Sequence, residues 1–180
     1  MNDYKEKLSK CTYNNTSKFS LKGRKFHAKC VDIYDGDTAT FCIFLNTNVY
    51  RFNMRLLGID TPEIRPSKND PDRDNEKIAA NYVKNRFLQL IVDNEIDLNK
   101  KYTKKEIRKI LENNIRLVTI YCDKFDKYGR CLVKIFRHED ESEDDSKSIN
   151  NILLNEKLAC KYGGGAKINY KTYFKVNDEN

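Results

Sequence analysis

The sequence predicts an α+β protein in which five β-strands form a small barrel flanked by helices. Three strand-like segments with alternating apolar and polar residues cover residues 26–59, and two more cover residues 115–136. A helical pattern of apolar residues separates the two groups. This order of elements is that of a five-stranded OB-type β-barrel with flanking helices, and it is also compatible with other α+β folds.

The first three strands are joined by short turns, which predicts a β-meander. The segments FHAKCVDIY, TATFCIFL and VYRFNMRLLGI are separated by DGDT and by NTN, both of which are rich in turn-forming residues. We expect the third strand to run without interruption from Val49 to Asp60. The last two strands, IRLVTIYC and RCLVKIF, form a hairpin around the polar loop DKFDKYG.

Helices are predicted at three places. In the first, apolar spacing predicts one buried stripe, made of Ile78, Ala79, Tyr82, Val83, Arg86, Phe87, Leu90 and Ile91. A second helix over 103–113 begins with a capping box of Thr103 and Glu106, and its outer surface is strongly basic. A third helix covers about residues 148–157.

The length of 180 residues is that of one domain. Residues 1–24 lack periodicity and are predicted to be a basic N-terminal arm, partly ordered. Residues 25–180 form the domain, with insertions near 93–113 and 138–147. The second insertion holds six acids within residues 139–145, a run typical of a solvated loop.

Composition favours a polyanionic partner, because the net charge is +7 and the isoelectric point is near 9.0. No segment has the ~20 apolar residues of a membrane span, and the first residues do not form a signal peptide. We therefore expect an intracellular, cytoplasmic protein with no membrane association and no evident obligate protein partner. Six scattered cysteines without a C-x-x-C pair, together with only two histidines, argue against zinc and predict reduced thiols.

Three short motifs place acids and arginines at the ends of predicted strands. They are DGDT at 35–38, RLLGIDTPE at 55–63 and DKYGR at 126–130. Each motif is weak alone, since DGDT also fits a hairpin turn and TPE a helix cap. Together they hold what phosphodiester hydrolysis needs, namely oxygen ligands for a hard divalent cation, arginines for phosphate and a spare carboxylate for water.

Taken together and in this order, the motifs resemble those of the staphylococcal (thermonuclease-like) nuclease family, and the likeness covers about residues 25–165. The resemblance implies a calcium-dependent nuclease that hydrolyses DNA, RNA or both and leaves 3′-phosphate ends. It implies metal ligation by the carboxylates of Asp37 and Asp60 and by the backbone carbonyl of Thr61.

The same resemblance implies the remaining roles. Arg55 and Arg130 bind the phosphate, and Glu63 is the general base or orients the attacking water. Substrate contacts are expected from Lys127, Tyr128 and Tyr162, and a structural asparagine is expected at Asn150 or Asn151. The alternative function is a non-catalytic OB-type module that binds single-stranded nucleic acid. The acids favour the enzyme, because a binding groove gains nothing from carboxylates that face a polyanion.

Overall fold

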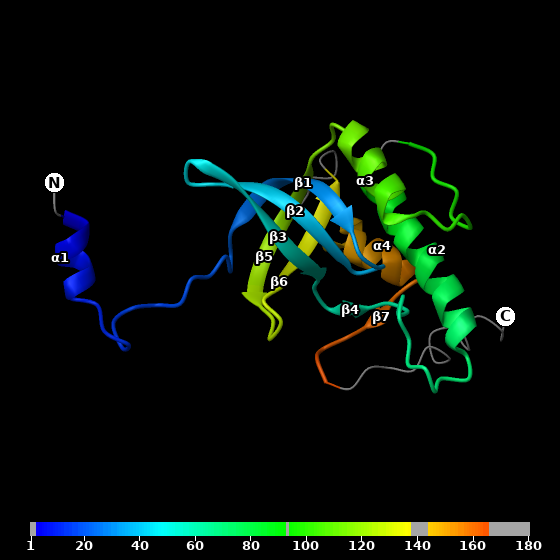
Figure 1. Cartoon of the computed structure of the whole chain (residues 1–180), viewed down its shortest axis with the longest axis horizontal. Helices are drawn as coiled ribbons and strands as arrows, with labels where there is room; N and C mark the ends of the chain where they lie inside the picture. The colour runs from blue at the N-terminus through cyan, green and yellow to red at the C-terminus, as the bar shows by residue number, and fades with distance from the viewer. Residues whose placement is uncertain (1–2, 93, 138–143, 166–180) are drawn as a thin grey trace.

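The computed structural model describes residues 3–92, 94–137 and 144–165. Five strands close into a barrel in the order β1-β2-β3-β6-β5 (Figure 1). These strands are β1 (Lys25–Ile33), β2 (Thr38–Leu45), β3 (Asn48–Leu56), β5 (Val118–Phe125) and β6 (Cys131–Arg137). The predicted α+β fold with a five-stranded OB-type barrel is confirmed.

The barrel closes through a parallel pair between β3 and β6, while its other neighbouring strands are antiparallel. In the parallel pair, Met54 lies opposite Cys131 and Arg55 lies opposite Leu132. The residue that precedes β6, Arg130, is therefore brought beside the end of β3. Two arginines 75 positions apart in the sequence meet at one edge of the barrel because of this closure.

The prediction of one strand from Val49 to Asp60 is wrong. β3 ends at Leu56, and Gly58 takes a left-handed conformation with φ 79° that turns the chain. The next two residues form β4 (Ile59–Asp60), which pairs outside the barrel with β7 (Cys160–Lys161) (Figure 1). This turn redirects Asp60 so that its side chain returns toward Arg55.

Three of the described helices lie against the barrel, with α2 and α3 on the same side of it (Figure 1). The structure has α2 (Arg73–Ile91), α3 (Lys104–Asn113), α4 (Ile149–Asn155) and a 3₁₀ turn, η2 (Asp145–Lys147). The capping box of Thr103 and Glu106 is confirmed. The stripe predicted for α2 is wrong at Ile78, which is 70% exposed, because the helix turns Ala80 toward the core together with the predicted Val83 and Phe87.

Asn150 at the start of α4 fixes three segments that surround the candidate site. Its side chain donates to the carbonyls of Leu57 and Val133 at 3.0 and 3.1 Å and accepts from the backbone N–H of Ile135 at 3.1 Å. Because this amide is buried, each of these hydrogen bonds satisfies a group that water cannot reach. Of the two expected positions, Asn150 is therefore the structural asparagine.

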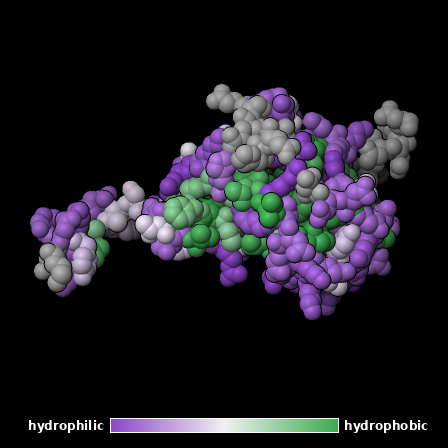
Figure 2. Space-filling model, turned by 90° about the horizontal axis from the view of Figure 1, so that it is seen from above, coloured by the Kyte–Doolittle hydropathy of each residue, from purple (hydrophilic) through white to green (hydrophobic). Residues whose placement is uncertain are grey.

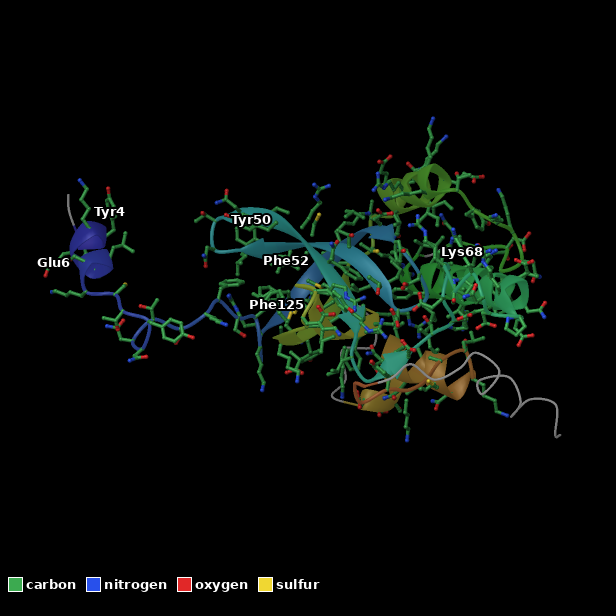
Figure 3. All side chains as sticks on the ribbon, turned by 60° about the horizontal axis from the view of Figure 1, so that its bottom comes forward. Tyr4, Glu6, Tyr50, Phe52, Lys68 and Phe125 are labelled. Carbon is green, nitrogen blue, oxygen red and sulfur yellow. The ribbon has the colours of Figure 1, made fainter. Side chains whose placement is uncertain are left out.

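The N-terminal segment reaches away from the barrel (Figure 1). It begins with a helix that the sequence did not predict, α1 (Asp3–Ser9), none of whose residues is buried. Further along, Phe19 packs against Phe125, with ring centroids 6.3 Å apart, and Leu21 is fully buried in the core. Figure 3 shows Phe125 with Phe52 at this end of the barrel and Tyr4 far from both.

The six cysteines are free thiols. Among the described residues, no helix is long and apolar enough to cross a membrane. The prediction that 139–145 is a solvated loop falls mostly on residues 138–143, which lie outside the described residues.

Candidate active site

The β1–β2 turn is held close to α2 by a glycine. A Cβ atom on Gly36 would come within 2.6 Å of Val83 Cγ1 and 2.9 Å of Thr61 Oγ1, which is closer than any side chain can approach. The residue must therefore be glycine for the turn to pack here. This packing places Asp37, almost fully buried, beside the segment that carries Asp60 and Thr61.

Arg55 lies between the two buried aspartates. Its Nη1 and Nη2 donate to the two carboxylate oxygens of Asp37 at 2.9 and 2.8 Å, a bidentate pair. Its Nη2 also approaches Asp60 Oδ1 at 2.5 Å. Both carboxylates thus contact the same guanidinium group.

Arg130 is joined to this cluster through Thr38. The Thr38 hydroxyl donates to Asp37 Oδ1 at 2.8 Å and accepts from Arg130 Nη1 at 3.4 Å. On its other side, Asp126 accepts from Arg130 Nε at 2.8 Å and from the Arg130 backbone N–H at 2.9 Å. Asp126 therefore fixes the direction of the Arg130 side chain, a role that the DKYGR motif contained but that sequence reasoning did not assign.

The surroundings shift the pKa values of two of these carboxyl groups in opposite directions. Burial raises the pKa of Asp37 to about 8, with a further contribution from nearby Asp35, while Arg55 opposes the rise. Burial also works against ionisation of Asp126, but the hydrogen bonds from Arg130 outweigh it and lower the pKa of Asp126. Asp126 is thus a stable anionic partner for Arg130. The ionised form of Asp37, in contrast, would be stabilised by an additional cation.

Glu63 lies in the loop after β4, and its position depends on a residue that sequence reasoning missed. The backbone N–H of Glu63 donates to the Glu76 carboxylate at 2.9 Å. Glu76 is buried at the start of α2, and burial, followed by the charges of Asp70 and Asp60, raises its pKa. No motif marked Glu76, because its partner is a backbone group 13 positions away.

A cavity of about 860 Å³ opens beside this cluster. The predicted site residues that line it are Arg55, Asp60, Lys127, Tyr128, Arg130 and Tyr162. Tyr128 is largely exposed, with Arg130 5.4 Å from its ring centroid. Arg55 lies 5.7 Å from the ring centroid of Tyr162, whose backbone N–H is bonded to Gly58. Both arginines and both tyrosines of the predicted site therefore line one cavity.

The donors around Arg55 fit a hard cation. Within the residues that the structure describes, no group of three or more His, Cys, Asp or Glu side chains is arranged to hold a metal. Two carboxylates do converge, those of Asp37 and Asp60, and the buried Thr61 follows directly. Calcium accepts carboxylate and backbone carbonyl oxygens and completes its coordination with water, so this set suits it.

Comparison with known proteins agrees with the fold and the motifs. The family described as staphylococcal nuclease homologue matches residues 53–179, more than half of the chain. An uncharacterized protein of Methanocaldococcus jannaschii is 30% identical over 171 residues, which cover 93% of this chain and 70% of that protein. The motif with Asp37 precedes the matched range, but the barrel places it within the same site. The chain therefore belongs to the staphylococcal nuclease homologue family.

Proposed function

We propose that the protein is a calcium-dependent nuclease that hydrolyses phosphodiester bonds of DNA, RNA or both and leaves 3′-phosphate ends. The observation that carries this proposal is the junction of two buried aspartates with Arg55, which lines one cavity together with Asp60 and Arg130. Membership of a nuclease family supports the same reaction.

Arg55 and Arg130 would bind the scissile phosphate. Both guanidinium groups line the cavity, and each presents planar donors that match two phosphate oxygens. During attack, negative charge grows on the oxygens of the phosphorus centre, and positioned donors stabilise that charge more than they stabilise the substrate. Asp126 and Thr38 keep Arg130 aimed at the cavity.

Glu63 would accept the proton of the attacking water. The water oxygen forms a bond to phosphorus, the bond from phosphorus to the 5′-oxygen breaks, and the 5′-oxygen leaves as a hydroxyl with a proton taken from a second water molecule. The hydrogen bond from the backbone of Glu63 to Glu76 holds this loop in place. Lys127, Tyr128 and Tyr162 would bind the rest of the nucleotide, since two rings and an ammonium surround the cavity.

Calcium, when bound by Asp37, Asp60 and the Thr61 carbonyl, would offset negative charge on the phosphate and lower the pKa of nearby water. In the structure Arg55 is the partner of both carboxylates. A cation held by Asp37 and Asp60 would replace these ion pairs, and the Arg55 guanidinium would then be available to phosphate.

The test is cleavage of single-stranded DNA, duplex DNA and RNA by the purified protein, with calcium and with excess EDTA. We expect cleavage with calcium, no cleavage with EDTA, and products that a 3′-phosphatase can shorten by one phosphate. Binding without cleavage under every condition would support the alternative, a non-catalytic module that binds single strands. Undiminished cleavage in EDTA would remove calcium from the mechanism.

A further inference from the structure

The outward side of the β2–β3 ribbon continues directly from the candidate active site. In the antiparallel register Thr38 lies opposite Arg55, and directly opposed residues share one face of a sheet. Three further pairs follow on the same face, at every second residue. They are Thr40–Asn53, Cys42–Arg51 and Phe44–Val49. These six residues are called the β2–β3 outer face below.

The β2–β3 outer face is open and carries both cationic and aromatic groups. Phe44 and Val49 are each 63% exposed, and Figure 2 shows apolar residues at the surface where the N-terminal arm leaves the body. Arg51 is exposed and forms no ion pair within the described part of the chain. Lys29 of β1 is in register with Cys42, so a second cation lies on the same side.

The spacing along β3 separates these groups from the cleavage site. Arg51 precedes Arg55 by four residues, which is about 13 Å at the rise of a β-strand. Arg51 therefore cannot hold the phosphate that Arg55 holds, but it can hold another phosphate of the same strand. Phe44 and Val49 lie beyond Arg51, at the hairpin tip near Tyr50, which Figure 3 marks.

We propose that the β2–β3 outer face binds the single strand of nucleic acid that extends from the cleavage site. Arg51 contacts a phosphate, and Phe44 stacks on an unpaired base, with Val49 widening the apolar platform. This inference rests on the proposed function. Two features favour this occupant, the unbroken register from Thr38 and Arg55 outward and the positive charge of the face.

A single strand fits this face better than a duplex does. Stacking on an exposed aromatic ring requires a base whose face is not already covered, which duplex bases are not. Barrels of the OB type bind oligonucleotides across the second and third strands and the adjoining loops. Here the loop that carries Asp37 leads into β2, and the loop that carries Arg130 leads into β6, which pairs with β3.

The experiment measures binding of a fluorescent single-stranded oligodeoxynucleotide of about 12 nucleotides without calcium, over a range of salt concentrations. Phe44→Ala is expected to weaken binding about tenfold with an unchanged salt slope, because stacking releases no counterions. Arg51→Ala is expected to weaken binding and to flatten the slope of log affinity against log salt by about 0.7. Lys77→Ala, which removes the same charge from the outer side of α2, is the matched control and should bind like the wild type.

The proposal is overturned if Phe44→Ala and Arg51→Ala both keep wild-type affinity and slope, or if the wild-type protein does not bind the oligonucleotide. An equal loss for a duplex of the same length would overturn the single-strand assignment. Unfolding midpoints by circular dichroism establish that the variants are folded. Cleavage of a dinucleotide with calcium tests the nuclease separately, and both variants should cleave it at the wild-type rate.

Discussion

Two clusters of arginine and aspartate on this protein differ in burial and therefore in what they can do. At the site, the side chain of Arg55 is 11% exposed and those of Asp37 and Asp60 are 2% exposed. In β1, Asp32, whose side chain is 16% exposed, pairs with Arg108 at 2.7 Å and Lys104 at 3.4 Å, and these two cations are 50% and 66% exposed.

The two clusters differ in how strongly water screens their ion pairs. Water screens the pairs around Asp32, and exposed pairs of this kind contribute little to stability. The cluster around Arg55 is shielded from water, so loss of one partner leaves the remaining buried charges with less compensation. The orientation of the side chain and the protonation of its acidic partners should therefore affect activity strongly at Arg55 and very little at Arg108.

The largest effect is expected from Asp37→Ala, which removes a proposed calcium ligand and one partner of Arg55. Cleavage should fall about a thousandfold or more, because several kcal/mol of charge stabilisation are lost. The barrel should remain folded, since Arg55 keeps Asp60 as a partner. Rates and circular dichroism together check this, and a cleaving variant would show that the buried cluster does not bind the metal.

Arg130→Lys should lower kcat about a hundredfold with a much smaller change in substrate binding. An ammonium cannot donate to Asp126 and to two phosphate oxygens in the geometry of a guanidinium. Single-turnover rates and equilibrium binding separate the two quantities. A lysine variant that cuts at the native rate would make Arg130 a simple backbone contact.

The affinity for calcium should rise with pH up to about pH 8 and then level off. The raised pKa of Asp37, about 8, means that a proton competes with the cation below that pH. Each pH unit lower therefore weakens calcium binding by up to about tenfold. Titration calorimetry between pH 6 and 9 measures this. Asp32→Asn, at the exposed cluster, should follow the same curve, whereas a flat wild-type curve would contradict the burial argument.

Glu76→Ala should lower kcat about tenfold, because the Glu63 backbone loses its buried acceptor. Glu76→Gln keeps an oxygen at the same place and should restore most of the rate, with KM unchanged in both variants. If glutamine behaves like alanine, the charge of Glu76 rather than its hydrogen bond is what the loop needs.

The smallest effects are expected on α3. Neutralising Lys104, Lys105 and Lys109 should weaken substrate binding and flatten its salt dependence, with kcat nearly unchanged. Lys104 already pairs with Asp32, so most of the change should come from the other two lysines. Arg108→Ala should leave the unfolding midpoint close to that of the wild type. A large drop in kcat in the triple lysine variant or in Arg108→Ala would show that the cluster around Asp32 also contributes to the reaction.

Most of the barrel could be predicted because its strands alternate and its turns are marked. DGDT and NTN interrupt apolar runs at places where the structure has turns, and Asn46 in the second turn takes a left-handed conformation with φ 57°. Gly58 misled the prediction, since a single glycine inside an apolar run does not reveal that it turns the chain. Ile78 misled it because neighbouring apolar residues allowed more than one helical face.

The site residues could be placed together only because three motifs occur in order. Sequence spacing does not show that β3 and β6 pair in parallel, and this pairing is what brings Arg55 and Arg130 to one cavity. Glu76 carried no signal, because its role depends on one backbone hydrogen bond across a loop. Contacts of this kind follow from the tertiary structure, so local patterns cannot reveal them.

The place of Arg55 between two aspartates has a consequence for assembly of the protein. Buried acids without a partner would oppose folding until a metal arrived, and the chain would then depend on calcium to fold. Arg55 instead supplies a counter-ion that is part of the chain, so we expect the barrel to fold without a bound metal.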